Sequence, residues 1–542
     1  MAETTAASAA PGLVRAVIDI RAFPGASAFL SAYTRSFDAV SPLFSGNPSD
    51  PSAWRAAIRR AQALPRDRQP LADVIAAQLS RREAPPEART MAARLADPSA
   101  VTVVTGQQAG AFGGPLYTLL KAVTTIQLAR HVEAQHGVPA VPIFWADGED
   151  HDWQEIRSAT VVGRDGALAD VAMPSFDGAG ERRSGDILLD ARVTGVVDAL
   201  FSALPVTGYS AALRETLTRC YRSGRSMAEA YAHFIEHLLG RHGLVVFESA
   251  DAAAKPFARD LFAEELRHAG RSSQQAIAAG EQSRALGFPP QVAPIEGSAA
   301  LFQLTPAREA IRVPFDGHAL AEDALAHPDR FSPNVLLRPV VQDRMFPNVA
   351  YVAGPGELAY HGQLDGIYKA FGVPRPLLYP RASATIMDAA ALRFLDKEHL
   401  PFAALAQGGE SALNALLESR LPEDAKGALV SAAGAIGDQW HALVPSLSQI
   451  DPTLEGAARA SLKRLQHELD TLQWKTVRAA KRRETTLRRQ FHHAQTLAFP
   501  HGSPQERVLS VAHFANQYGP ALADKLVDGL PMEMGSHWLV TI

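Results

Sequence analysis

The chain has 542 residues, which at roughly 150 residues per domain indicates three or four domains. Apolar residues make up 47% and charged residues 20%, so the composition supports a folded core and excludes a disordered protein. The net charge of −4 argues against a surface built for nucleic acid or anionic lipid, and the single cysteine, Cys220, excludes an intramolecular disulfide and a cysteine-rich zinc site.

The N-terminus lacks the basic and apolar regions of a signal peptide, and no run of about 18 apolar residues occurs that would span a membrane. A reducing compartment fits the single cysteine. We therefore expect a cytoplasmic protein that acts on small molecules, without membrane or nucleic-acid partners.

Residues 1–95 are rich in alanine, arginine and proline, and predict an N-terminal segment of short helices and loops joined to the core. Residues 101–104 are a β-branched run that predicts a buried strand, followed by a glycine-rich loop and a helix over residues 115–137. Residues 141–145 predict the next strand. Because this order is typical of a parallel βαβ unit, residues 96–160 are expected to begin a Rossmann-like α/β core.

The same alternation returns later in the chain. Further strands are predicted at residues 243–247, 348–352 and 376–379. A helix is predicted from residue 354 to about residue 371. The alternation assigns two more segments to the parallel-sheet core, 241–280 and 331–385. Two segments that do not fit it are expected to be insertions, 161–240 and 281–330.

Residues 386–500 are helical in pattern throughout. Spacings of three and four between apolar residues predict a coiled coil or helical hairpin, through Leu462, Leu465, Leu469 and Leu472 and then Leu487, Phe491, Ala494 and Ala498. A proline-containing break ends this α-helical coiled-coil domain. A shorter helical segment, 501–542, closes the chain.

Ligands of open parallel sheets bind beyond the carboxyl ends of the strands, so polar residues just after predicted strands are the candidate site. The loop after the first strand contains Gln107 and Gln108 among several glycines. It spells neither a dinucleotide-binding fingerprint nor a P-loop, but backbone N–H groups before a helix can hold an anion. This motivates nucleotide binding at Gly106, Gly110 and Gly114, and the alternative is a tight turn without a ligand.

Lys121 lies on the helix that follows this loop. Only nine of the 53 basic residues are lysines, and Lys121 is the only one before Lys255. In a chain that favours arginine so strongly, a compact ammonium near a helix N-terminus indicates contact with a phosphate or carboxylate oxygen. The alternative is chance, because nine lysines must fall somewhere.

The loop after the second strand, residues 147–152, holds four carboxylates and His151. Such a density of charge repels itself unless a cation, an ammonium group or sugar hydroxyls lie nearby. His151 is a candidate general base beside a carboxylate. No paired histidine spacing accompanies the run, so no zinc site is expected, and a need for another metal is left open. The alternative is a solvated loop.

The other strand ends offer weaker candidates: Glu248 and Asp251, then Glu357, Tyr360 and His361, then Arg381 and Ser383. Cys220 has no histidine or glycine-rich motif near it and is not expected to be a nucleophile. Arg482 and Arg489 belong to a basic helix, which is either a solvated coiled-coil face or a nucleotide- or partner-binding surface.

Several of these segments together resemble the BshC family of cysteine ligases in bacillithiol biosynthesis. The resemblance rests on VTGQQAG at 104–110, GPLYT at 114–118 with Lys121, FW at 144–145 with GEDHD at 148–152, LRP at 337–339 with Gln342 and Asp343, Tyr351 with Gly354, Pro355 and Glu357, and QERV at 505–508. The matches run in order over most of the chain.

The resemblance implies a carbon–nitrogen ligase that joins L-cysteine to glucosaminyl-malate to give bacillithiol, with ATP or ADP as the expected cofactor. It also implies a Rossmann-like core with connecting-peptide insertions, similar to class I aminoacyl-tRNA synthetases, and a homodimer formed through the coiled coil. The HIGH and KMSKS motifs of those synthetases are absent, so the mode of activation is left open.

Under this assignment His151, Lys121 and Asp150 are the expected catalytic residues, and His151 deprotonates the sugar amine. The expected substrate-binding residues are Gln107, Gln108, Tyr117, Asp147, Glu149, Asp152, Glu357, Tyr360 and Arg381. Two other classes stay open: another small-molecule ligase or nucleotidyl transferase on the same core, and a coiled-coil scaffold or nucleic-acid-binding protein that uses the basic helix.

Overall fold

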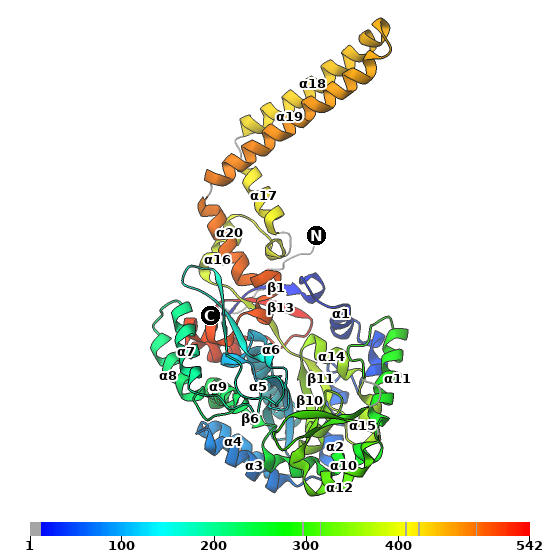
Figure 1. The fold of residues 1–542 in the computed structure, drawn as a ribbon, viewed down its shortest axis with the longest axis vertical. Coiled ribbons are helices and arrows are strands. Elements are labelled where there is room, and N and C mark those ends of the chain that lie inside the picture. Colours follow the sequence, from blue (N-terminus) through cyan, green and yellow to red (C-terminus); the bar gives the residue numbers. More distant parts are fainter. Residues whose placement is uncertain (1–11, 295–297, 315, 407–408, 421–422, 484) are drawn as a thin grey trace. The chain divides into compact units, whose positions relative to one another are not determined.

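The computed structural model describes residues 12–294, 298–314, 316–406, 409–420, 423–483 and 485–542 (Figure 1). They form two compact units. The second unit is residues 387–502, and the rest of the chain makes up the first unit.

A parallel five-stranded sheet lies at the centre of the first unit, with the order β11-β10-β2-β3-β6. Its strands are β2 (Val101–Gln108), β3 (Ala140–Asp147), β6 (Val245–Glu248), β10 (Asn348–Ala353) and β11 (Leu377–Pro380). Nearly all of their residues are buried, as expected for apolar runs in a parallel sheet that is covered on both faces. The sheet confirms the predicted Rossmann-like class.

The order of these strands determines where a ligand can bind. From β2 the chain moves to β3 and β6 on one side, whereas β10 and β11 lie on the other side of β2. The connections therefore diverge between β2 and β10. In open α/β sheets such a change of direction creates a crevice at the carboxyl ends of the two strands.

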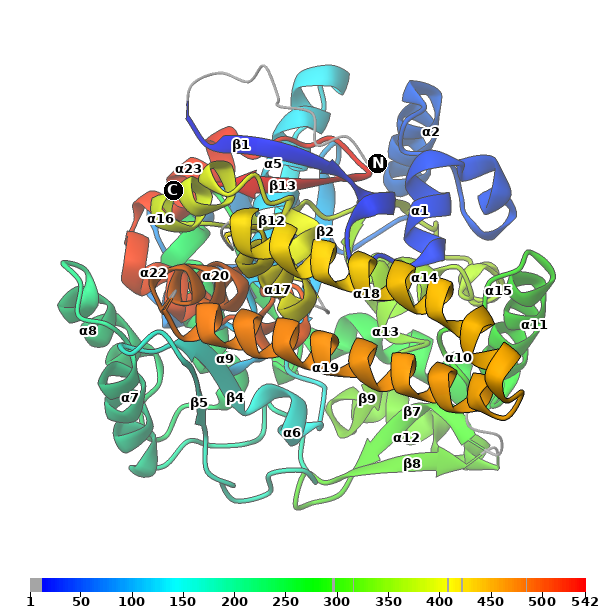
Figure 2. The same cartoon turned by 90° about the horizontal axis from the view of Figure 1, so that it is seen from above.

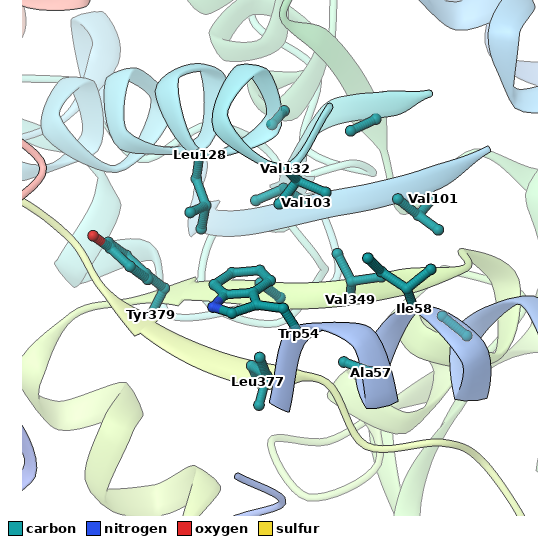
Figure 3. Packing of buried hydrophobic residues seen from close by; sticks show 14 of the residues in the cluster. Trp54, Ala57, Ile58, Val101, Val103, Leu128, Val132, Val349, Leu377 and Tyr379 are labelled. Atoms are coloured by element: carbon teal, nitrogen blue, oxygen red, sulfur yellow. The ribbon is translucent and has the colours of Figure 1, made fainter. Parts of the chain in front are cut away.

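Helices α2 (Pro51–Ala63) and α5 (Leu116–His136) pack on the sheet through one apolar cluster (Figure 3). Its members include Trp54, Ile58, Val101, Val103, Leu128, Val132, Val349 and Leu377. α5 connects β2 to β3 and ends at Gly137, whose φ of 66° favours glycine. The other helices before the sheet are α1 (Ala28–Arg35), α3 (Arg68–Arg81) and α4 (Pro86–Ala93).

Two long segments add elements outside the parallel sheet. Between β3 and β6 lie α6 (Trp153–Ile156), β4 (Ser158–Val162), β5 (Leu168–Ala172), α7 (Arg192–Ala203), α8 (Ser210–Cys220) and α9 (Met227–Leu239). Between β6 and β10 lie α10 (Arg259–Arg267), α11 (Arg271–Ala285), β7 (Ser298–Leu304), β8 (Ala310–Pro314), α12 (Ala321–Ala326), β9 (Phe331–Pro333) and α13 (Arg338–Met345). The second segment forms a sheet of its own, in the order β8-β7-β9.

A further sheet pairs strands from distant parts of the chain, and Figure 2 shows two of them, β1 and β13, side by side. β13 (Ser536–Val540) is antiparallel to β1 (Val14–Asp19) and parallel to β12 (Ser383–Ile386). The structure thus adds strands to two segments, 1–95 and 501–542, for which helices and loops are predicted. Local periodicity does not reveal this pairing, because the partners are separated by most of the sequence.

The predicted helix from residue 354 to 371 is two helices in the structure. α14 (Pro355–His361) ends at Gly362, and α15 (Asp365–Ala370) begins a few residues later. The break turns the chain so that α14 alone starts at the carboxyl end of β10. The helices of the C-terminal segment are α21 (Gln505–Val508), α22 (Val511–Tyr518) and α23 (Ala521–Gly529).

The second unit is helical and contains the predicted hairpin. α18 (Glu423–Ile450) and α19 (Leu454–Arg483) run side by side in Figures 1 and 2. The remaining helices are α16 (Ala389–Lys397), α17 (Gly409–Ser419) and α20 (Thr485–Ala498). Despite their length, none of the helices among the described residues is apolar enough to cross a membrane.

Candidate active site

A cavity of about 690 Å³ lies where the connections of the parallel sheet diverge. It is lined by residues that follow β2, β3, β10 and β11, together with residues from the segment between β6 and β10. The lining brings together twelve predicted site residues: Gly106, Gln107, Gln108, Tyr117, Lys121, Asp147, Glu149, Asp150, His151, Glu357, Tyr360 and Arg381.

Lys121 lines this cavity with only 3% of its side chain exposed. Its Nζ atom donates to the backbone oxygen of Gly106 at 2.8 Å and to Oε1 of Gln107 at 2.9 Å, and it lies 2.5 Å from Oε2 of Glu357. Burial lowers the pKa of Lys121, and the charge of Glu357 opposes that shift. The ammonium therefore connects the end of β2 to the first turn of α14, the helix after β10.

Glu357 completes this ion pair from the first turn of α14. Its carboxylate accepts hydrogen bonds from the backbone N–H of Gly354 and from the hydroxyl of Tyr351, both at 2.7 Å. Burial alone would raise the pKa of Glu357, but the charge and hydrogen bond of Lys121 outweigh it and lower the pKa. Glu357 is thus an ionised carboxylate with both oxygens occupied.

Asp147, the last residue of β3, has weaker contacts. Its Oδ2 atom lies 3.5 Å from Nε of Arg338, and its Oδ1 atom accepts from the N–H of Glu149 at 3.2 Å. Arg338 donates from its Nη2 atom to the hydroxyl of Tyr360 at 2.7 Å. Burial raises the pKa of Asp147 to about 6, against the lowering effect of Arg338. This carboxyl group therefore changes charge near neutral pH.

Glu149 lies two residues further on and has strong charged partners. Its carboxylate accepts from Nη1 of Arg183 at 2.8 Å, from Nζ of Lys255 and from Oγ of Ser332. Burial would raise the pKa of Glu149, but Arg183 and Lys255 lower it to about 2. Because Arg183 lies between β3 and β6 while Lys255 and Ser332 lie between β6 and β10, Glu149 links these two segments to the end of β3.

Gln108 organises the rest of the acidic loop. Its Nε2 atom donates to Oδ2 of Asp150 at 2.5 Å and to Oε2 of Glu155 at 2.9 Å. The ring of His151 instead lies edge-on to the ring of Phe302, with the centroids 5.4 Å apart. Within the described part of the chain, no hydrogen-bond partner contacts the His151 ring, so the carboxylate expected to orient this histidine is not in place.

Arg381 follows β11 and is held by a carboxylate from the C-terminal segment. Its Nη1 and Nη2 atoms donate to the two carboxylate oxygens of Glu506 at 3.0 and 2.6 Å. The guanidinium also lies 5.7 Å from the ring centroid of Tyr117. Glu506 neutralises the charge of Arg381. A ligand in the cavity therefore meets the ring of Tyr117 and a paired guanidinium, and not an unpaired cation.

Three of the predicted site residues near these strand ends do not line the cavity: Asp152, Gly110 and Gly114. Oδ1 of Asp152 accepts from the N–H of Glu155 and caps α6. Gly110 and Gly114 pack against each other, and a Cβ atom on Gly110 would lie 2.9 Å from the Cα atom of Gly114. Both glycines therefore serve the tight turn that the sequence left as the alternative.

Three backbone N–H groups of the glycine-rich loop and the helix after it have partners within the protein. The backbone N–H of Leu116, the first residue of α5, donates to the oxygen of Leu509 at 2.9 Å, and those of Gly110 and Gly114 donate within the loop. Gly106 lines the cavity, but its carbonyl oxygen is bound by Lys121. These three N–H groups are therefore not available to a nucleotide phosphate, and nucleotide binding at this loop stays a prediction.

The remaining candidates lie elsewhere. Arg489 is an exposed residue of α20 in the second unit, and the side chain of Arg482 lies outside the described residues. Glu248 faces Arg82, with Oε2 and Nη1 3.7 Å apart, and does not line the cavity. Cys220 is fully buried, and burial raises the pKa of its thiol to about 12, so it has no access to a ligand.

Sequence reasoning missed several residues that line the cavity. Arg338 begins α13 and Arg507 lies in α21, so neither follows a strand of the parallel sheet. Both lie in segments that carry the family resemblance, and that resemblance was the signal that could have identified them. Phe302 and Arg312 come from β7 and β8, and nothing in their local sequence indicated that this sheet would reach the site.

The lining combines charges of both signs. Within the described residues, Arg312 and Arg507 are the cations of the lining that have no carboxylate partner. Asp150 and Glu155 are carboxylates bound to the neutral amide of Gln108. The site is therefore suited to a small polar ligand that carries carboxylate groups together with ammonium or hydroxyl groups.

Two family models match the chain. "Bacillithiol biosynthesis BshC, N-terminal Rossmann-like domain" covers residues 17–382, and "Bacillithiol biosynthesis BshC, C-terminal coiled-coil domain" covers residues 384–542. Curated relatives named "Putative cysteine ligase BshC" match over most of their length. The Salinibacter ruber protein is 33% identical over 94% of this chain and 95% of its own. The Geobacillus kaustophilus protein is 31% identical over 95% of this chain and 98% of its own.

Proposed function

The chain belongs to the BshC family of bacillithiol biosynthesis, and from this premise we propose that it is a ligase that joins L-cysteine to glucosaminyl-malate through an amide bond, giving bacillithiol. The observation that carries the proposal is the cavity lined by unpaired cations and by carboxylates. Glucosaminyl-malate carries carboxylates, hydroxyls and an amine, and cysteine carries an ammonium group and a carboxylate. A cavity of about 690 Å³ is in the usual range for small-molecule sites.

The roles of the lining residues follow from their charges. Arg312 and Arg507 would bind substrate carboxylates, and Asp150 and Glu155 would bind ammonium or hydroxyl groups. The buried ammonium of Lys121 would stabilise negative charge that develops on a reacting carbonyl oxygen. A preorganised cation of this kind acts more strongly in a buried site than in water.

Amide formation from a free carboxylate requires an activated acyl group. We propose ATP as the source of activation because the chemistry demands one. The glycine-rich loop offers no support for this, so no step is assigned to a nucleotide there. The described part of the chain contains no group of three or more histidine, cysteine, aspartate or glutamate side chains arranged to hold a metal ion. The assay below tests whether the reaction requires a metal.

The test is a coupling assay followed by mass spectrometry. The purified chain is supplied with L-cysteine and glucosaminyl-malate, with and without ATP, and with and without EDTA. We expect the mass of bacillithiol in the arm that contains ATP. The absence of coupled product in every arm contradicts the proposal, and coupling with a different acceptor would favour another small-molecule ligase on the same core.

We also propose that the chain forms a homodimer through the α18–α19 hairpin. Large apolar side chains are exposed along it, including Val430, Ile450, Leu472 and Trp474, with 51–77% of each accessible. Exposed apolar side chains of this size on both helices are the observation that supports association with a second copy. Sedimentation equilibrium should give a dimer for the wild type and a monomer for Leu472→Glu/Trp474→Glu, and a monomeric wild type contradicts the proposal.

A further inference from the structure

Asp147 differs in its surroundings from the other carboxylates that line the cavity. It ends β3, opposite Gln108 of β2, and therefore lies beside the point where the connections of the sheet diverge. Its side chain is 14% exposed, so it is largely removed from water but still reaches the cavity. Glu155 of α6, by contrast, is exposed.

The buried carboxylates also differ in how they are paired. Glu357 is bound by Lys121 and Tyr351, and Glu149 is bound by Arg183, Lys255 and Ser332. These partners keep both groups ionised, so neither accepts a proton near neutral pH.

Asp147 has no comparable partner. The charge nearest to it is Arg338 at 3.5 Å, and the terminal nitrogen of that arginine is bonded to Tyr360 instead. The other groups that act on Asp147 are Glu149 and Asp150 of its own loop, which raise its pKa. Tyr231 of α9 also interacts with it electrostatically and is uncharged.

These observations identify Asp147 as the buried group of the cavity that can both lose and gain a proton under working conditions. Burial raises its pKa to about 6, which is near the value that makes a general base effective at neutral pH. His151 is less well placed to act as the base. Its ring packs against Phe302, and no carboxylate among the described residues orients it.

We propose that Asp147, rather than His151, accepts the proton that converts the ammonium group of the bound substrate into the neutral amine that attacks. In this step an N–H bond of the ammonium breaks, its electron pair stays on nitrogen, and an O–H bond forms on the Asp147 carboxylate. The amine then has the lone pair that an attack on an acyl carbon requires. This inference rests on the proposed ligase function.

The test is the pH dependence of kcat/KM in the full-length protein. For the wild type we expect activity to rise with pH through an enzyme group near pH 6, because Asp147 must be deprotonated to act. Asp147→Asn should lower kcat about 100-fold or more and remove this dependence, while KM for glucosaminyl-malate changes less than about threefold. Asp147→Glu should restore part of the activity, together with the rise of kcat/KM with pH near pH 6.

Two further variants separate this role from the alternatives. His151→Asn should keep the rise of kcat/KM near pH 6, and the exposed Asp260→Asn should behave as wild type. Three outcomes would overturn the inference while the ligase function stands. The rise of kcat/KM near pH 6 could be lost in His151→Asn, it could persist in Asp147→Asn, or the wild-type profile could be flat between pH 5 and 7. A wild type that yields no coupled product overturns both.

Discussion

The ammonium of Lys121 and the carboxylate of Glu357 lie 2.5 Å apart and join two helices, α5 and α14, beside the point where the strand connections diverge. α5 follows β2 and α14 follows β10, and these strands are neighbours in the sheet although about 240 residues separate them in sequence. The pair thus fixes the width of the crevice, and the positive charge faces the cavity.

Replacing this lysine should therefore affect both activity and stability. Lys121→Met leaves Glu357 buried without its cation, which typically costs about 3–5 kcal/mol. We also expect kcat/KM to fall about 100-fold or more, because a preorganised positive charge is lost. Urea unfolding and steady-state kinetics measure the two effects.

The double variant Lys121→Met/Glu357→Gln provides the control for this prediction. It should unfold at a higher urea concentration than Lys121→Met, because no buried charge is left unpaired, and it should stay inactive. If Lys121→Met keeps kcat/KM within about threefold of the wild type, Lys121 has no role in the reaction.

Glu149→Gln should destabilise the first unit strongly. The substitution leaves the buried side chains of Arg183 and Lys255 without their shared carboxylate, and we expect a loss of about 3–5 kcal/mol in the free energy of unfolding. The exposed Glu181→Gln, on the inserted segment that contains Arg183, should change stability by less than about 0.5 kcal/mol. Equal urea midpoints for the two variants would contradict the role assigned to Glu149.

Glu248 should make stability fall as pH rises. Burial raises its pKa from 4.5 to about 7, so between these values the folded state retains a proton that the unfolded state has lost. The free energy of unfolding therefore decreases as pH rises through this window. Asp147 and Asp343, both with a pKa raised to about 6, contribute with the same sign.

Glu248→Gln removes one of these groups. Its free energy of unfolding should decline less between pH 5 and pH 7.5 than that of the wild type, by about 1–3 kcal/mol. Urea titrations at several pH values measure the slope. An equal decline in the two proteins would mean that Glu248 is stabilised as a carboxylate by Arg82 rather than held neutral.

Cys220 should report unfolding and have no part in catalysis. Its thiol is fully buried and its pKa is raised to about 12, so a disulfide reagent should label the native protein very slowly and the urea-unfolded protein at once. Cys220→Ser should keep kcat/KM within about twofold. Rapid labelling of the native state, or loss of activity in the variant, would place this thiol at an accessible site.

Much of the core could be predicted because its signals are local. The β-branched run before Gly106 and the helix that ends at Gly137 follow from short-range periodicity and turn chemistry. The polar residues at the strand ends account for ten of the twelve predicted residues in the cavity, because parallel strands present their carboxyl ends at one edge. Lys121 was predicted from the scarcity of lysine, and Tyr117 from the family resemblance.

What could not be predicted depends on contacts between distant residues. His151 lacks its expected carboxylate because Gln108 holds Asp150. The N–H groups of Gly110 and Gly114 bond within the glycine-rich loop, and that of Leu116, the first residue of α5, bonds to Leu509, a residue nearly four hundred positions away. Arg338 enters from the start of α13, where strand alternation gives no signal. In each case a long-range partner determines the chemistry of a residue that looked available in the sequence.

The pairing of Arg381 with Glu506 has a consequence for the order in which the site is made. The ribosome places Arg381 in the growing chain 125 residues before it adds Glu506, and the whole second unit is synthesised between them. A nascent chain that ends before residue 506 therefore carries a guanidinium in its pocket with no counterion. Binding competence should appear late in translation, after the entire helical unit has left the exit tunnel.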